Sequence, residues 1–206
     1  MDFVHIADKA YTREQILGME GIVLNALKFE LTMPSMLRFA ERYGALSKFE
    51  NRQLLGNMNE IVLSDGVTSI TAEKCFDFTL QYLCELTLQE YKYLIFAPSQ
   101  IVCAASVILH ASLSQHSNTI DLWSPFMIEQ THYYLSDLLS CVNELLISLS
   151  ATNIKYRAVR KKFGQKKWGE VSKQTFAQIK KVIDQHQLES NSANESFNAA
   201  DGTVFQ

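Results

Sequence analysis

Apolar residues recur along most of this chain with the three- and four-residue spacing of an amphipathic α-helix. Six stretches show the spacing. They predict helices over residues 13–29, 34–43, 71–88, 98–115, 125–132 and 134–149. Five of these lie between residues 34 and 150, close enough in sequence to pack against one another. The pattern therefore predicts an all-α fold with one compact helical domain.

Prolines and gaps in the pattern mark where the predicted helices begin and end. The chain's three prolines, Pro34, Pro98 and Pro125, each stand at the start of an apolar stretch. Proline is favoured there because its missing N–H would have no helical partner in the first turn. The segment 45–70 lacks the helical pattern and is long for a connection in a helical bundle, so we expect a partly ordered surface loop there.

The width of each apolar face predicts how deeply a helix is buried. The stretch 98–115 is apolar around almost its whole circumference, as is typical of a central helix, whereas 134–149 is apolar on one side only. The stretch 13–29 opens with a capping box, in which Thr12 caps the helix and Gln15 reaches back to the cap. Its apolar arc of roughly 220° is wider than a surface helix needs, so we expect neighbours on two sides.

Composition narrows the class of protein. The chain has 206 residues, of which 47% are hydrophobic, and a formal net charge of −3, values that are ordinary for globular proteins. No stretch is apolar enough for a membrane span, and the first residues lack the basic start of a secretory signal. The four cysteines are widely spaced without a C-x-x-C pair. We therefore expect a reducing intracellular compartment, with neither a zinc site nor a disulfide framework.

Charge is distributed unevenly along the chain. Residues 155–206 contain ten Lys or Arg and five Asp or Glu, whereas residues 1–154 contain nine and seventeen. The basic run 155–167 could contact phosphates, but such a run is more often a solvated helix end, and we expect no nucleic-acid partner. Past Leu188 the chain offers little to bury, which predicts disorder from about residue 189.

Candidate chemistry is sparse. No phosphate-binding glycine motif, zinc-protease motif or nucleophile elbow occurs, and the five histidines are scattered. His110 could act as a general base, but a lone histidine on an apolar helix is more often a hydrogen-bonded core residue. Glu85 and Glu90 could form a carboxylate pair, but the sequence brings no cation to them, and a capped, solvated helix end is the simpler interpretation. We therefore expect that the protein is not an enzyme and uses no cofactor.

Several sequence blocks carry specific motifs. Three lie near the start: DFVHIAD at residues 2–8, YTREQILGME at 11–20 and LKFEL at 27–31. Four follow: YLCELTLQEY at 82–91, FAPSQIVCAA at 96–105, KYR at 155–157 and KKWGEVS at 166–172. Together these blocks resemble mitotic A/B-type cyclins, most closely the B type. The first three are similar to the end of that family's first cyclin box, and the others to its second box and the basic segment after it.

The resemblance implies a fold, a partner and a contact surface. It implies a regulatory subunit, located in the nucleus or cytoplasm, that binds a cyclin-dependent protein kinase and helps control mitotic progression. By position, the residues that it places near the kinase are Phe3, His5, Ile6, Tyr11 and Gln15. Phe3 is the strongest of these, because an apolar ring near the chain start has no local partner and would bury well against another protein.

The resemblance also predicts the domain organisation. Residues 1–31 correspond to the last helix of the first cyclin box, 32–172 to the whole second box, and 173–206 to a C-terminal extension. Most of the first box is absent, so the chain reads as truncated at its N-terminus. We therefore expect reduced activation of the kinase. The alternative is a stand-alone cyclin-box module, or a non-activating fragment, that competes with intact cyclins for their partners.

Overall fold

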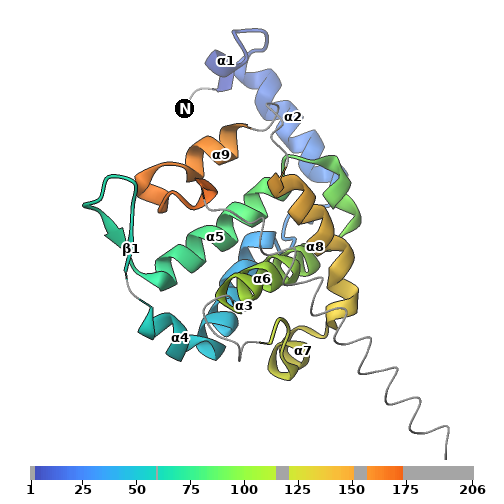
Figure 1. The fold of residues 1–206 in the computed structure, drawn as a ribbon. Coiled ribbons are helices and arrows are strands. Elements are labelled where there is room, and N and C mark those ends of the chain that lie inside the picture. The colour runs from blue at the N-terminus through green and yellow to red at the C-terminus, as the bar shows by residue number, and fades with distance from the viewer. Residues whose placement is uncertain (1–2, 59, 115–120, 151–156, 174–206) are drawn as a thin grey trace, which may run out of the picture. The chain divides into compact units, whose positions relative to one another are not determined.

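The computed structural model describes residues 3–58, 60–114, 121–150 and 157–173. The chain divides into two compact units, Met1–Pro34 and Ser35–Gln206. The first unit contains α1 (Phe3–Ile6) and α2 (Arg13–Ala26), and the second contains the other elements (Figure 1). The disorder predicted from about residue 189 lies outside the described residues.

The second unit is almost entirely helical, and this bears out the all-α fold class. In chain order its elements are α3 (Met36–Glu50), α4 (Arg52–Asn57), β1 (Ile61–Val62), β2 (Ser69–Ile70), α5 (Ala72–Thr87), the 3-10 helix η1 (Tyr91–Ile95), α6 (Pro98–Ser114), α7 (Pro125–Thr131), α8 (Leu135–Ser150), α9 (Arg157–Phe163), and the 3-10 helices η3 (Lys166–Trp168) and η4 (Val171–Lys173). Each of the six predicted stretches contains a helix. Among the described residues, no helix is both long and apolar enough to cross a bilayer.

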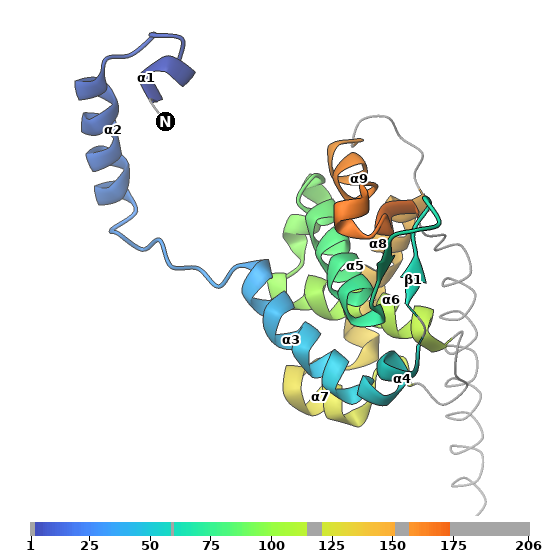
Figure 2. The same ribbon diagram turned by 90° about the vertical axis from the view of Figure 1, so that its left-hand side faces the viewer.

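Helix α6 is the centre of the second unit, as its sequence predicts. It packs against α3, α5 and α8, which surround it in Figures 1 and 2. Val102, Ala105 and Ile108 have no exposed surface. Because burying one such branched side chain contributes about 1.5–3 kcal/mol, this helix carries much of the hydrophobic stabilisation of the unit.

Polar caps fix where the helices begin. Thr71 accepts a hydrogen bond from the backbone N–H of Lys74 at the start of α5, and Ser124 caps α7 in the same way, just before Pro125. The position of Pro34 differs from our expectation. Helix α3 begins at Met36 after an N-cap at Ser35, so Pro34 lies outside the helix instead of in its first turn.

The expectation of a surface loop over 45–70 is wrong in part. Helix α3 continues to Glu50 and α4 follows almost at once, because Leu55 buries its side chain in the core. A short antiparallel hairpin comes next, with Ile61 paired to Ile70. Asp65 closes its turn by accepting hydrogen bonds from the backbone N–H groups of residues 67 and 68.

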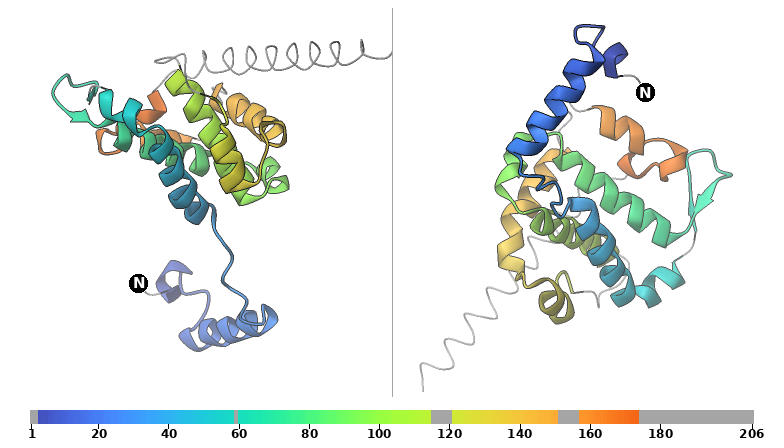
Figure 3. Two further views of the ribbon diagram at one scale, coloured as in Figure 1. Left: turned by 90° about the horizontal axis from the view of Figure 1, so that it is seen from below. Right: turned by 180° about the vertical axis from the view of Figure 1, so that it is seen from behind.

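The basic segment after α8 ties the unit together instead of standing free in solvent. Arg160 donates to the carbonyl oxygens of Ser148 and Leu149 at 2.7 and 2.9 Å, where α8 leaves carbonyls unpaired. Lys162 lies 2.6 Å from Glu85 of α5. Seen from behind, α9 lies beside α5 (Figure 3). The interpretation of this run as a solvated helix end is therefore wrong at these positions.

Candidate partner-binding surface

Helix α1 is a single turn that is closed by a tight backbone reversal. The N–H of Lys9 donates to the carbonyl of Val4 at 2.9 Å, and Asp8 and Lys9 both have a positive φ, of 49° and 60°. Three of the four side chains of α1, those of Phe3, His5 and Ile6, are exposed. Phe3 and Ile6 are 67% and 60% exposed, values far outside those of core residues.

The start of α2 is fixed by the predicted capping box. The N–H of Gln15 donates to Thr12 Oγ1 at 3.3 Å, and the N–H of Thr12 donates to Gln15 Oε1 at 2.9 Å. Glu14 in the first turn accepts a backbone hydrogen bond and lies against Thr12, and both contacts lower the pKa of its carboxyl. The capping box therefore holds the side-chain oxygen of Gln15 at the helix start.

The end of α2 is closed without glycine. The N–H of Leu27 donates to the carbonyl of Val23, and the N–H of Phe29 reaches back to the carbonyl of Leu24 at 3.0 Å. This five-residue return is the bond of a Schellman cap. Lys28 adopts the left-handed conformation that the cap requires, with φ 51°. Helix α2 thus has satisfied polar groups at both ends.

Between these ends, the first unit exposes its apolar side chains. No described residue of α1 or α2 is buried. Large apolar side chains with 47–82% of their surface exposed are Phe3, Ile6, Tyr11, Leu17, Met19, Ile22, Val23, Leu27, Phe29, Leu31 and Met33. Monomeric proteins rarely leave contiguous apolar patches larger than a few hundred Å² in solvent. Taken by itself, this unit therefore has an apolar surface that another protein surface could cover.

The five residues that the resemblance places near a kinase all lie in this unit. They are Phe3, His5 and Ile6 of α1, Tyr11 before the capping box and Gln15 in it, and all five are exposed. Their role as contacts stays a prediction. The wide apolar arc predicted for α2 is also present, although the helix ends at Ala26 instead of residue 29.

The second unit carries a further exposed apolar surface that the sequence analysis missed. Leu88, Tyr91, Leu94 and Ile95 follow α5 and are 71–87% exposed. Buried anchors hold this segment. Tyr93 is 2% exposed, and its hydroxyl donates to the carbonyl of Glu144 at 2.9 Å. The sequence signal for this surface is a run of large side chains, but such a run fits a segment buried in the core equally well.

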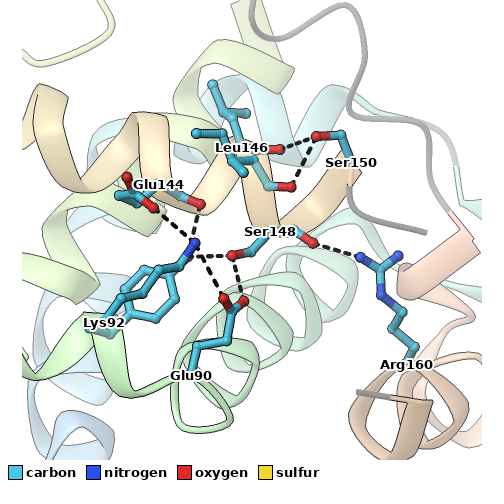
Figure 4. Close-up of polar contacts among 9 residues, drawn as sticks. Glu90, Lys92, Glu144, Leu146, Ser148, Ser150 and Arg160 are labelled. Carbon is cyan, nitrogen blue, oxygen red and sulfur yellow. Dashed lines mark hydrogen bonds and ion pairs between the residues drawn. The ribbon is translucent and has the colours of Figure 1, made fainter. Parts of the chain in front are cut away.

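A polar network joins that segment to α8 (Figure 4). Ser148 donates to Glu90 at 2.6 Å, and Lys92 forms ion pairs with Glu144 and Glu90 at 2.8 and 3.3 Å. Burial opposes the charge of Lys92, but the two carboxylates outweigh it and its pKa is raised. The interpretation of Glu85 and Glu90 as a solvated end without a cation is wrong, because the fold brings Lys162 to one and Lys92 to the other.

His110 is a core residue, as the simpler interpretation predicts. It is 1% exposed, and burial lowers the pKa of its imidazole to about 4. Burial likewise raises the pKa of Cys84, Cys103 and Cys141 to about 12, so these thiols stay protonated at neutral pH. Across the ranges that the structure describes, no three His, Cys, Asp or Glu side chains are grouped to hold a metal ion.

A groove of about 390 Å³ lies between α3 and α5 and is a weaker candidate for a site. Leu37, Phe78 and Leu80 give it apolar walls. Its charged residues are already paired with one another or with neighbours, for example Lys48 with Asp77 at 2.7 Å. No converging set of polar groups is available for a ligand, so the exposed first unit is the better candidate.

Comparison with known proteins agrees with this two-part organisation. Residues 63–177 match the model of the family described as "Cyclin, C-terminal domain", and residues 1–32 match "Cyclin, N-terminal domain". Cyclin-A2-1 of Oryza sativa subsp. japonica is 31% identical over 86% of this chain and 32% of its own length. The G2/mitotic-specific cyclin-B of Hydra vulgaris is 31% identical over 83% of this chain and 40% of its own length.

A human relative also matches most of the chain with a small part of its own length. The G2/mitotic-specific cyclin-B3 of Homo sapiens is 30% identical over 84% of this chain but only 10% of its own length. The chain therefore spans well under half of the curated relatives it matches. Because the C-terminal domain model covers more than half of the chain and A- and B-type relatives cover most of it, the chain belongs to the cyclin family.

Proposed function

We propose that the chain is a cyclin-like regulatory subunit that binds a cyclin-dependent protein kinase and helps control mitotic progression. The observation that carries the proposal is the match to both cyclin domains, with A- and B-type mitotic relatives along most of the chain. In this function the chain performs no chemistry itself. It acts on the kinase's own catalytic machinery, in the nucleus or the cytoplasm, and uses no cofactor.

The exposed face of α1 is the kinase contact in this proposal. Phe3 and Ile6 lie one turn apart and are both more than half exposed, so they present a small apolar surface with His5 beside it. Aromatic side chains that become fully buried dominate the binding energy of many interfaces. Phe3 is therefore the residue whose loss should weaken kinase binding most.

Binding and activation are separable in this chain. An activator works by binding the active conformation of its partner more tightly than the inactive one. Only residues 1–32 of the chain match the N-terminal cyclin domain, so much of the surface that could make this distinction is outside the chain. We propose that binding persists while activation is reduced. A chain that binds without activating would compete with intact cyclins.

A titration with a purified mitotic cyclin-dependent kinase tests the contact. Phe3→Ala should weaken binding at least tenfold, because it removes a ring that the complex buries. Phe49→Ala is the matched control, since Phe49 is a similarly exposed phenylalanine, at 59%, in α3 of the other unit. Equal affinities for the wild-type chain and the Phe3 variant would exclude this contact.

A phosphorylation assay on the same samples distinguishes partial activation of the kinase from competition with intact cyclins. A partial activator raises phosphorylation above that of the kinase alone. A competitor leaves the kinase at its basal rate and lowers the rate obtained with an intact cyclin. Absence of binding by the wild-type chain would contradict both forms of the proposal.

The basic segment supports a protein partner over a nucleic acid. Arg160, Lys162 and Lys166 each contact carbonyl or carboxylate groups of the second unit. Lys162 and Lys166 are already paired with carboxylates, and the donors of Arg160 already bind two backbone carbonyls, so these three side chains are poor anchors for phosphates. Binding to nucleic acid would fall steeply with salt concentration, and we expect no such binding.

A further inference from the structure

The groove between α3 and α5 owes its shape to small residues on α3. A Cβ atom at Gly44 would lie only 2.8 Å from Cδ2 of Leu80, so the two helices touch at this position. Ala40 and Ala45 line the groove beside that contact, and their short side chains leave a hollow of about 390 Å³. This hollow suits a few apolar side chains from one face of a helix.

The described part of the chain ends close to one end of this groove. Phe78 of α5 lines the groove, and the ring of Trp168 packs edge-on against it, with ring centroids 5.4 Å apart. The next element, η4, lies on α5 and ends at Lys173. Five residues of chain reach at most about 18 Å. The segment that follows Lys173 therefore starts within reach of the Phe78 end of the groove.

The groove runs along two antiparallel helices. Lys48 of α3 pairs with Asp77 of α5 at 2.7 Å, whereas Met36, near the start of α3, contacts Thr87 at the end of α5. The wall that α3 provides runs from Leu37 to Lys48, a rise of about 16 Å. A helix of about a dozen residues that enters at the Asp77 end would span this length.

The sequence after Lys173, which lies outside the described residues, has the pattern of such a helix. It reads QTFAQIKKVIDQHQL at residues 174–188. Phe176, Ile179 and Ile183 stand at positions i, i+3 and i+7, which places them on one face of a helix. The match to the C-terminal cyclin domain ends at residue 177, so the pattern belongs to a part of the chain that the family model does not cover.

The charges of this segment are complementary to those on the rim of the groove. Glu41 and Arg38 of α3 lie 3.1 Å apart, with side chains 55% and 78% exposed. Such an exposed ion pair contributes little, so both groups remain available to a further partner. Lys180 and Asp184 stand one turn apart, on one flank of the predicted apolar face.

One register satisfies both charges. If the segment lies antiparallel to α3 with Lys180 opposite Glu41, Asp184 falls opposite Arg38, because both helices rise equally per residue. The same register brings Phe176 to the hollow at Ala45. In a parallel arrangement, Asp184 would lie opposite Ala45 and leave Arg38 without it.

We propose that residues 174–188 fold back as an amphipathic helix into the groove between α3 and α5, antiparallel to α3. The occupant of the groove is thus the chain's own C-terminal segment, held by Phe176 and by the pairs Lys180–Glu41 and Asp184–Arg38. The groove and the segment both belong to the unit Ser35–Gln206, whatever the position of Met1–Pro34. This contact is independent of kinase binding.

Hydrogen exchange of the purified full-length chain without a kinase tests the charge pairs. Amides of 176–188 should exchange at least tenfold more slowly than those of an unstructured peptide of the same sequence. Glu41→Lys and Lys180→Glu should each reduce this protection about tenfold. The double variant should recover the wild-type value within about threefold, since it exchanges the partners without removing them. Lys181→Glu is the matched control, because its side chain points away from the apolar face and its variant should keep full protection.

Two further variants test the apolar contact from both sides. Phe176→Asp removes the ring that fills the hollow, and Ala45→Arg fills the hollow from α3, so each should bring the exchange of 176–188 to the unstructured rate. Unstructured exchange of 176–188 in the wild-type chain overturns the proposal. So does protection that persists in either variant, or that the double charge exchange fails to restore. Variants of the groove that alter exchange in 13–26 instead of 176–188 would also overturn it, because the first unit would then be the occupant.

Discussion

A buried histidine connects three parts of the second unit. Nδ1 of His110 lies 3.2 Å from the carbonyl oxygen of Leu122, and Nε2 lies 3.4 Å from Nδ2 of Asn51. A carbonyl only accepts hydrogen bonds, so Nδ1 carries the proton and Nε2 accepts from the amide. Asn51 also donates to the carbonyl of Ser47 in α3. The neutral imidazole therefore joins α6 to the end of α3 and to the segment before α7.

This contact predicts loss of stability in mild acid. Burial lowers the pKa of His110 from 6.5 to about 4. Between these two pH values the imidazole is therefore protonated in the unfolded chain and neutral in the folded chain. The contribution of the neutral imidazole to the free energy of unfolding is complete above pH 6.5 and is lost as the pH falls toward 4. It amounts to up to about 3 kcal/mol. His110→Gln, which keeps a donor and an acceptor, should flatten the pH dependence of urea unfolding over this range.

Identical pH profiles for the wild-type chain and His110→Gln would contradict that assignment. The other acidic and basic groups are the same in both proteins, so their contributions cancel in the comparison. The sequence predicts that His110 is a core residue because its neighbours on the helix are apolar. Its partners were not predictable, since Asn51 and Leu122 are far from it in the chain.

At the scale of elements, the network between η1 and α8 holds an otherwise irregular segment. Tyr93 and Glu90 come from the connection after α5, and Ser148 and Glu144 come from α8. Burial raises the pKa of Tyr93 to about 12, so its hydroxyl remains a donor at any physiological pH. The network lets this connection expose Leu94 and Ile95 without losing its own conformation.

Removing one hydroxyl tests the contribution of the network. Tyr93→Phe should lower the free energy of unfolding by about 1–2 kcal/mol, because the ring still fills its site while the Glu144 carbonyl and Ser148 lose a buried partner. Tyr91→Phe is the control. Tyr91 is 87% exposed in the same 3-10 helix, so its variant should unfold at the wild-type urea concentration. Equal destabilisation by both variants would show that the network is not the cause.

The elements differ in how far they could be predicted. The long helices α5, α6 and α8 follow from apolar periodicity, because each packs a continuous face on the core. Helices α4 and α9 have six and seven residues and little apolar period, and no proline marks where they begin, as Pro125 does for the equally short α7. The hairpin pairs only two residues of each strand, and its turn is held by Asp65 and by an ion pair from Lys166, 101 positions away. Such distant contacts leave no local pattern.

At the scale of the whole molecule, the chain combines a packed helical unit with a short one in which no described residue of α1 or α2 is buried. The sequence predicts the packed part from its apolar periodicity, and the expectation that the wide apolar arc of α2 has neighbours on two sides stays a prediction. The five predicted contact residues fall together in the exposed unit. The surface around Leu94 was not predictable, since exposure there depends on the distant network with α8.

Hydrogen exchange across the chain, with and without a mitotic cyclin-dependent kinase, tests the central claim most directly. The measurement is made at a concentration where the free chain is monomeric. Amides of α6 should exchange slowly in both samples, because this helix is buried. Amides of 3–26 should exchange fast in the free chain and become protected when the kinase binds. Exchange of 13–26 as slow as that of 98–114 in the free monomer, unchanged by the kinase, would contradict the account.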